Sequence, residues 1–179
     1  FFNAENFKKI FPAEKAKIIT SIAMFYDLED PVKFASDIEA ILEDEGIWHF
    51  EQSYLPSMLR TNSYDTICQE HLEYYSLIAV NYILGKSNLK VIDIELNDIN
   101  GGSFAITAAK KNSKHVVNKA VIDWMLEEEI KMGLNTEKPY LEFAKRVKEH
   151  RESLISLLDK LKSEGRKIIG YGASTKGNV

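Results

Sequence analysis

Hydrophobic positions in the first part of the chain predict two strands joined by a helix. Residues 17–25 form a short apolar run rich in β-branched side chains, which is typical of a buried parallel strand. The Asp-Pro pair at 30–31 predicts a helix start, and the Glu-Gly pair at 45–46 predicts its end. The apolar stripe of this helix consists of Phe34, Ile38, Ile41 and Leu42. Residues 47–52 predict the next strand, so we expect a β-α-β unit with a right-handed crossover.

The second part of the chain predicts a hairpin between helices. Residues 70–84 predict a helix that ends at Gly85. Polar and apolar residues alternate over 89–96 and 103–109, and the turn residues between them predict an antiparallel pair at a sheet edge. The other predicted elements are helices at 113–132 and 139–163 and a strand at 167–172. The pattern therefore predicts an α/β fold whose sheet-forming part gives way to helices between residues 110 and 140.

Composition narrows the class of protein. Hydrophobic residues make up 45% of the 179 positions, which is enough for a sizeable core and excludes a disordered chain. The net charge of −4 gives no basic field for nucleic acid, and no apolar run approaches the roughly 20 residues of a membrane helix. We therefore expect neither partner. The single cysteine, Cys68, excludes an internal disulfide and predicts a reducing cytoplasm, and the scattered histidines predict no metal site.

The adjacent Glu70 and His71 are the strongest chemical candidates. They follow a strand end, and active sites of open α/β sheets lie beyond the carboxyl ends of strands. Histidine is a general base near neutral pH without large tuning of its pKa. The alternative is that the pair only decorates a helix start, where an early carboxylate is favoured.

Several motifs in order resemble the sugar C-methyltransferases. Residues 50–55 match the pattern F-E-x-x-Y-L and residues 65–71 match D-x-I-x-x-E-H, and the resemblance continues through 101–103 and 170–177. It implies that residues 1–112 are the second half of a class I methyltransferase (Rossmann-like) sheet. Residues 113–179 would be a helical connection and the start of a truncated C-terminal Rossmann-like substrate-binding domain.

The cofactor that the resemblance implies is S-adenosylmethionine. Its glycine-rich turn and its ribose-binding acid would lie before Phe1, because no such turn precedes residue 46. We therefore expect both ends of the sequence to be cut and this chain alone to bind the cofactor poorly. Asp27, after the first strand, is the candidate beside the methyl-transfer centre, with an ordinary strand-end aspartate as the equal alternative.

The implied reaction methylates a carbon next to the keto group of a nucleotide-linked deoxysugar. In this family His71 would remove the proton to give an enolate, with Glu70 orienting or assisting it. Cys68 and Ala105 stand where many family members have tyrosine and arginine, which favours a variant substrate. The rival hypotheses are a class I methyltransferase with another small acceptor, methylating oxygen or nitrogen, and a non-catalytic Rossmann-like nucleotide-binding module.

The remaining candidates are expected to bind substrate. Tyr54 at a strand end would contact sugar or cofactor, although a wall tyrosine with a satisfied hydroxyl explains it equally well. The turn residues Gly101, Gly102 and Ser103 permit close backbone approach to a ligand, and a plain tight turn is the alternative. The second glycine turn would offer backbone N–H groups and a point charge to the nucleotide diphosphate. Its candidates are Gly172, Ala173, Ser174 and Lys176.

Overall fold

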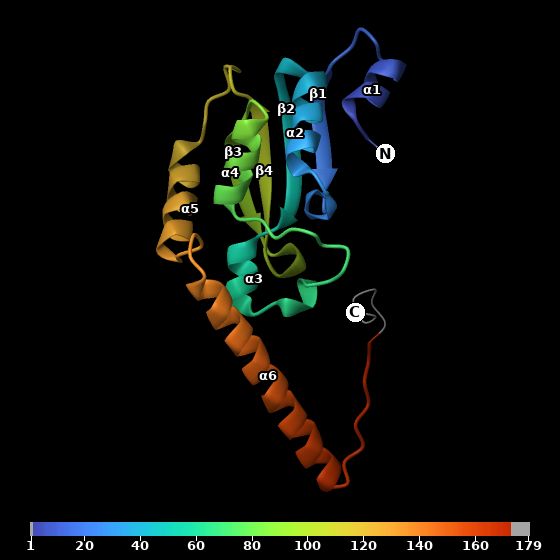
Figure 1. Cartoon of the computed structure of the whole chain (residues 1–179), viewed down its shortest axis with the longest axis vertical. Coiled ribbons are helices and arrows are strands. Elements are labelled where there is room, and N and C mark those ends of the chain that lie inside the picture. The colour runs from blue at the N-terminus through green and yellow to red at the C-terminus, as the bar shows by residue number, and fades with distance from the viewer. Residues whose placement is uncertain (1, 173–179) are drawn as a thin grey trace.

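A four-stranded sheet forms the centre of the molecule, seen in a computed structural model that describes residues 2–172 (Figure 1). In sheet order its strands are β1 (Ala16–Ile22), β2 (Leu42–Ser53), β4 (Ser103–Lys110) and β3 (Leu89–Asn97). β1 and β2 are parallel, and β4 runs antiparallel to both β2 and β3. The predicted α/β fold and the antiparallel pair of 89–96 with 103–109 are therefore confirmed.

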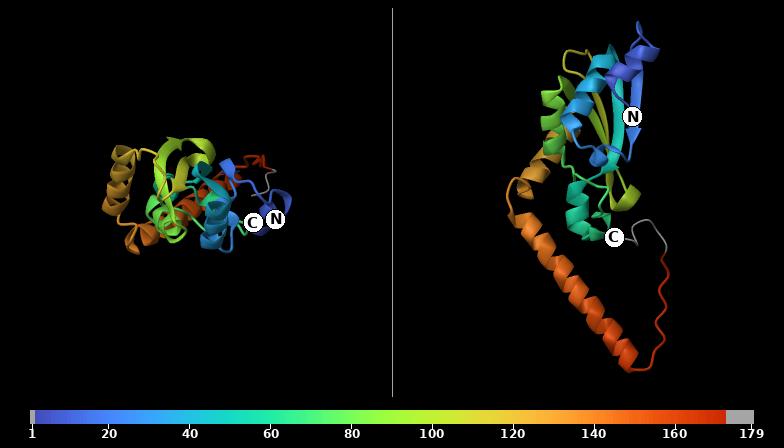
Figure 2. Two further views of the ribbon diagram at one scale, coloured as in Figure 1. Left: turned by 90° about the horizontal axis from the view of Figure 1, so that it is seen from above. Right: turned by 45° about the vertical axis from the view of Figure 1, so that its right-hand side comes forward.

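Helices lie on one face of this sheet and beyond its last strand (Figure 2). α2 packs on β2 and on α4, α4 packs on β3, and α5 packs on both α4 and β3. Their bounds, with those of the other helices, are α1 (Ala4–Ile10), α2 (Pro31–Ile41), α3 (Leu55–Thr61), α4 (Leu77–Lys86), α5 (Lys119–Lys131) and α6 (Lys138–Ser163). Three strands end at the edge of the sheet where α3 and the β3–β4 turn lie, and this carboxyl edge positions the candidate residues.

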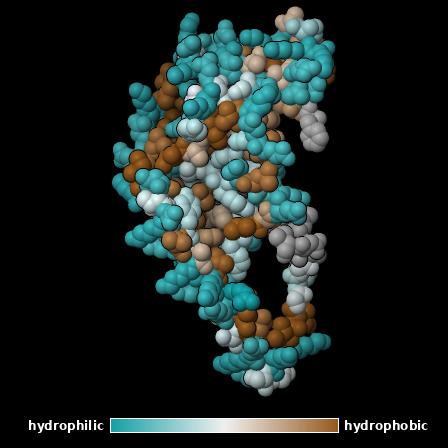
Figure 3. All heavy atoms as spheres, in the orientation of Figure 1, coloured by the Kyte–Doolittle hydropathy of each residue, from teal (hydrophilic) through white to brown (hydrophobic). Residues whose placement is uncertain are grey.

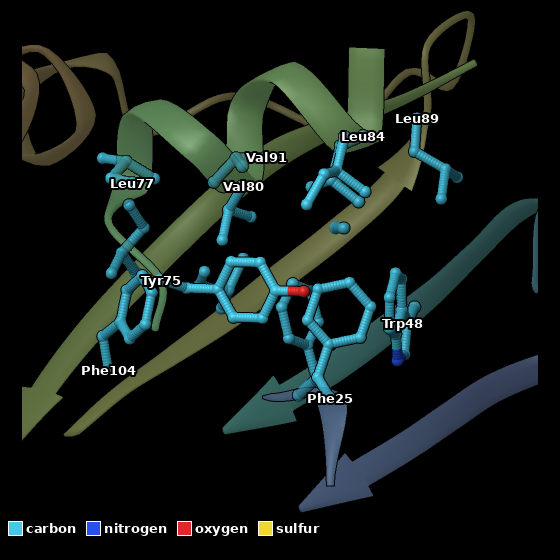
Figure 4. Close-up of a cluster of buried hydrophobic side chains, with 14 of the residues drawn as sticks. Phe25, Trp48, Tyr75, Leu77, Val80, Leu84, Leu89, Val91 and Phe104 are labelled. Atoms are coloured by element: carbon cyan, nitrogen blue, oxygen red, sulfur yellow. The ribbon is translucent and has the colours of Figure 1, made fainter. Parts of the chain in front are cut away.

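An aromatic cluster joins the segment after β1 to β2 near that edge. Trp48 and Phe50 alternate on β2 toward the helices, and both are fully buried. The Phe25 ring lies 5.5 Å from the Trp48 ring, 5.3 Å from Phe50 and 5.1 Å from Tyr75 (Figure 4). Such ring pairs add about 0.5–1.5 kcal/mol each beyond the burial of apolar area. The segment after β1, which carries Tyr26 and Asp27, is thereby fixed against the end of β2.

Two predicted boundaries in this region are wrong. The first helix ends at Ile41, and Leu42 lies in β2, because its backbone pairs with Ala16 of β1. The first strand ends at Ile22 and is less buried than predicted, since no described element covers the outer face of the sheet there. Ile18 and Ile22 are exposed on that face.

The long helix α6 is attached to the sheet domain through its first half only. Phe143 packs with Met58 and Leu59 of α3, and Arg146 Nη2 donates a 2.6 Å hydrogen bond to the Leu59 carbonyl. The helix then extends away from the sheet (Figure 1), and apolar side chains are exposed toward its far end (Figure 3). These are Leu154, Ile155, Leu157 and Leu158.

The predicted strand at 167–172 is wrong for the described chain. Residues 166–172 are irregular and exposed. No other strand within residues 2–172 lies beside them, so their backbone N–H and C=O groups find no sheet partners. A strand needs such pairing, because its hydrogen bonds all come from a neighbour.

Candidate active site

The loop that carries Glu70 and His71 is irregular, and the predicted helix over 70–84 begins only at Leu77. Ser76 caps α4, accepting a 3.3 Å hydrogen bond from the Ala79 N–H. Just before Ser76 the backbone bonds to the segment after β2 and not to a helix. Leu55 N donates to the Tyr75 carbonyl at 2.9 Å, and Tyr54 and Tyr75 form a parallel bridge. The pair therefore does not open a helix, and the alternative reading as a helix start does not hold.

The segment after β1 holds this loop in place. The Tyr26 carbonyl accepts hydrogen bonds from the N–H groups of both Leu72 and Glu73, at 2.9 and 3.1 Å. The Tyr26 ring lies 4.3 Å from the His71 ring, measured between centroids. One residue thus fixes both the imidazole and the backbone that follows it.

The protonation pattern of His71 follows from its partner. Its Nδ1 lies 2.8 Å from the Thr66 carbonyl oxygen, which can only accept, so Nδ1 carries the hydrogen. In the neutral ring the lone pair then resides on Nε2, and the half-buried side chain is a proton acceptor of fixed tautomer.

Two carboxylates share the neighbourhood of the imidazole. Partial burial raises the pKa of Asp27, the nearby His71 opposes that rise, and Glu70 adds to it. The structure therefore brings Asp27, Glu70 and His71 together, although they come from different loops. Glu70 itself is exposed, and within residues 2–172 no hydrogen bond joins it to His71. The bond that orients the ring comes from Thr66.

Sequence reasoning missed Tyr26, Thr66 and Tyr74 around His71. The Tyr74 hydroxyl lies 3.4 Å from the same Thr66 carbonyl, and burial raises the pKa of both tyrosines. Both phenols lie near Cys68, the position where the resembling family has its tyrosine. Position next to Asp27 was the one signal that could have found Tyr26.

Tyr54 faces the helices and belongs to a different network. Its side chain is buried, its hydroxyl hydrogen-bonds Glu129 of α5, and burial followed by the Glu129 charge raises its pKa. Glu129 is completely buried and also accepts from the N–H groups of Leu77 and Ile78 at 2.6 and 2.9 Å. This carboxylate, which no local pattern distinguished, joins the start of α4 to the end of β2.

The turn Gly101-Gly102-Ser103 packs closely against α3. Gly102 has a φ of 120°, and a Cβ there would lie 2.5 Å from the Ser57 Cβ. The Gly102 carbonyl accepts from Tyr54 N at 3.0 Å, and the Ser103 hydroxyl donates to the Ile99 carbonyl at 2.8 Å. A hollow of about 430 Å³ lies beside this turn.

Gly102→Ala is expected to destabilise the protein by about 2–4 kcal/mol, because it combines a left-handed backbone with a steric clash. Gly85→Ala in α4 is the matched control, since nothing lies within 4 Å of a Cβ there. The control should be neutral or stabilise by about 0.5–1 kcal/mol. Urea unfolding of both variants measures this, and equal midpoints would show that the turn tolerates a side chain.

The second glycine turn is described only at its beginning. Gly172 is exposed and irregular, while Ala173, Ser174 and Lys176 lie outside the described residues. Within residues 2–172, no group of three or more histidine, cysteine or acidic side chains could hold a metal ion. In the same part of the chain no helix is long and apolar enough to span a bilayer.

Comparison with known proteins agrees with the motifs. A family model described as the C-methyltransferase C-terminal domain matches residues 98–179. The C-methyltransferase NovU of Streptomyces niveus is 32% identical over 164 residues, covering 92% of this chain and 39% of NovU. The chain therefore spans less than half the length of this curated relative.

Two of the solved structures that match part of this chain are methyltransferases of low sequence identity. The mitomycin 7-O-methyltransferase MmcR is 14% identical with a TM-score of 0.46, over 54% of this chain and 30% of that chain. A SAM-dependent methyltransferase from Aquifex aeolicus is 16% identical with a TM-score of 0.39, over 53% of this chain and 46% of that chain. The family model and the similarity to NovU support a fragment of the C-methyltransferase family.

Proposed function

We propose that the protein containing this chain is an S-adenosylmethionine-dependent methyltransferase that acts on a carbon next to the keto group of a nucleotide-linked deoxysugar. The observation that carries the proposal is His71, whose Nδ1–H is bonded to a carbonyl and whose Nε2 is left as a base. Carbon methylation needs such a base, because the carbon becomes nucleophilic only after it has lost a proton. The family-model match and the similarity to NovU support the reaction class.

The residues at the carboxyl edge suit the cofactor. Asp27 is exposed next to the Tyr26 ring, and a carboxylate and an aromatic face both favour a sulfonium cation. When bound, S-adenosylmethionine supplies an electrophilic methyl group. Asp27 would lie on the cofactor side of the site, and Glu70 would be the second acidic group there.

His71 performs the proton transfer in this proposal. Its Nε2 takes the proton from the carbon next to the ketone, and the electron pair moves into the carbonyl to give an enolate. The resulting positive charge lies near the Asp27 carboxylate, whose pKa burial raises and the neighbouring His71 lowers. Tyr26 remains a neutral phenol against the ring, because burial raises its pKa.

The wider assignment follows the same proposal. Residues 1–112 contribute the second half of the cofactor-binding domain, and residues 113–179 contribute the helical connection and the start of a substrate-binding domain. We place the activity in the cytoplasm, where the single Cys68 stays reduced. Gly172, Ala173, Ser174 and Lys176 are assigned to substrate binding.

Deuterium exchange tests the proposed reaction directly. We expect the full-length protein to exchange the hydrogen next to the ketone of a nucleotide-linked keto-deoxysugar with D2O when no methyl donor is present. The control is the same sugar with its ketone reduced to an alcohol, which should not exchange because no enolate forms. Methylation of an oxygen or nitrogen without any carbon exchange would establish the rival acceptor instead.

A further inference from the structure

Two hollows lie side by side at the carboxyl edge, between α3, the β3–β4 turn and α5. One has a volume of about 280 Å³ and largely apolar walls that include Trp124 and Met132. The other, of about 430 Å³, is lined by polar groups that include Asn97, Asp98 and Ser103. Both are lined by Ser57, Arg60 and Leu96, so the two hollows join at these residues.

Arg60 brings an uncompensated positive charge to the junction. It lies in the last turn of α3 with its side chain exposed, and within residues 2–172 it forms no ion pair. The acidic Glu128 of the apolar hollow is already paired with Lys131 at 2.8 Å. A planar guanidinium that forms no ion pair is suited to bind a phosphate through two parallel hydrogen bonds.

Trp124 offers a stacking surface in the apolar hollow. It is 54% exposed, while Tyr54 and Met125 in the same wall are buried. A half-exposed indole beside buried apolar side chains is suited to stack against a planar base, and such stacking contributes about 1–3 kcal/mol per base. The polar hollow at the other side offers acceptors for hydroxyl groups, with Asp98 the charged one.

The polar hollow lies beside the strand end that lines the hollow of His71. Ser103 lines the polar hollow and pairs directly with Ser53 in the β2–β4 register. Ser53 in turn lines a small hollow together with His71 and Tyr26. Four features therefore follow one another along the edge. They are the proton acceptor His71, the hollow lined by hydroxyl groups, the cation Arg60 and the aromatic wall at Trp124.

We propose that this series is the binding track of the nucleotide-linked sugar. The base stacks on Trp124, the diphosphate is bound by Arg60, and the sugar extends past Ser103 toward His71. The assignment rests on the proposed function, and it names Arg60 and Trp124 as the nucleotide-binding residues. The order of chemical groups along a nucleoside diphosphate sugar is the same as the order of surfaces along the edge.

Fluorescence titration of the 179-residue chain with thymidine diphosphate and uridine diphosphate tests the track. Trp48 is fully buried and Trp124 is the second of two tryptophans, so stacking should quench the exposed indole. Arg60→Gln should raise the Kd for a diphosphate about 10–100-fold and leave the Kd for the free nucleoside unchanged, because the lost hydrogen bonds involve a charged group. Trp124→Leu should raise the Kd for the diphosphate and the Kd for the free nucleoside about 10-fold each. It should also remove the quenching, so calorimetry measures binding to this variant.

Two surface variants serve as controls. Arg151→Gln removes an exposed arginine of α6, and Tyr82→Leu removes an exposed aromatic of α4, both outside the two hollows. Both should bind as the unaltered chain does. Absence of nucleotide binding at millimolar concentration, or Kd values for Arg60→Gln and Trp124→Leu within twofold of the unaltered chain, would overturn the track. Nucleotide binding requires no methyl donor and no proton transfer, so a failed exchange experiment with intact binding would refute the proposed reaction alone.

Discussion

His71→Asn is expected to lower kcat by roughly 10²–10⁴-fold in the full-length enzyme, which is the usual contribution of general-base catalysis. Asparagine can still donate its side-chain N–H to the Thr66 carbonyl, so the loop should keep its shape. What it lacks is the lone pair of Nε2. Because that interaction belongs to the transition state, KM and cofactor affinity should change little. Steady-state kinetics with a radiolabelled methyl donor, together with the exchange of hydrogen for deuterium, measure both quantities.

A second histidine provides the control for this substitution. His115 also uses one ring nitrogen on a backbone carbonyl, since its Nε2 lies 2.9 Å from the Glu45 oxygen at the start of β2. His115→Asn should therefore preserve turnover. If His71→Asn kept both turnover and exchange, the base would have to be another group, and Asp27 would be examined first.

Glu129→Ala is expected to destabilise the fold by about 3 kcal/mol or more. The substitution leaves the Leu77 and Ile78 N–H groups and the Tyr54 hydroxyl without their buried acceptor, and each unmade bond costs about 1–3 kcal/mol. These two N–H groups open α4, where no residue of the helix itself can satisfy them. Urea unfolding monitored by circular dichroism gives the loss.

Neighbouring substitutions separate the network from a general effect of charge. Glu128→Ala removes the adjacent carboxylate, which is partly exposed and paired with Lys131. This change should lower the free energy of unfolding by at most about 1 kcal/mol. Combining Glu129→Ala with Tyr54→Phe should cost less than the sum of the single changes, because the two side chains share a hydrogen bond. Strict additivity, or equal losses for Glu128 and Glu129, would contradict the buried network.

The sequence predicted those parts of the fold whose signals are local. Alternation over 89–96 and 103–109 and the glycine turn between them specify the β3–β4 hairpin, because period and turn chemistry agree. The same holds for α6. The helix predicted over 113–132 begins only at Lys119, because the backbone before it bonds to β3, with Asn118 N donating to the Ile92 carbonyl. The loop over 70–76 was predicted as helix because its bonds to Tyr26 and Tyr54 come from residues far away in the sequence. Leu42 likewise entered a strand through pairing with Ala16.

Prediction of the candidate site was limited in the same way. Positions after strand ends predicted Asp27, Glu70 and His71, and the fold brings them to one neighbourhood. Thr66 acts through its backbone carbonyl, which no side-chain pattern can reveal. Glu129 resembles the two glutamates before it in the sequence, and only its complete burial sets it apart. Tyr26 could not be predicted, because its role depends on which loop lies against the His71 ring.

The main-chain acceptor of His71 also makes the site tolerant of mutation. A carbonyl oxygen is present whichever residue occupies position 66, so no ordinary side-chain replacement there deletes the bond that fixes the tautomer. The side chains of the loop can therefore change while His71 keeps its orientation. Evolution can vary the walls around the substrate without first rebuilding the proton acceptor. Loss of the base would come from shortening the loop or from altering its path, which points to insertions and deletions over 62–76 as the changes that silence such an enzyme.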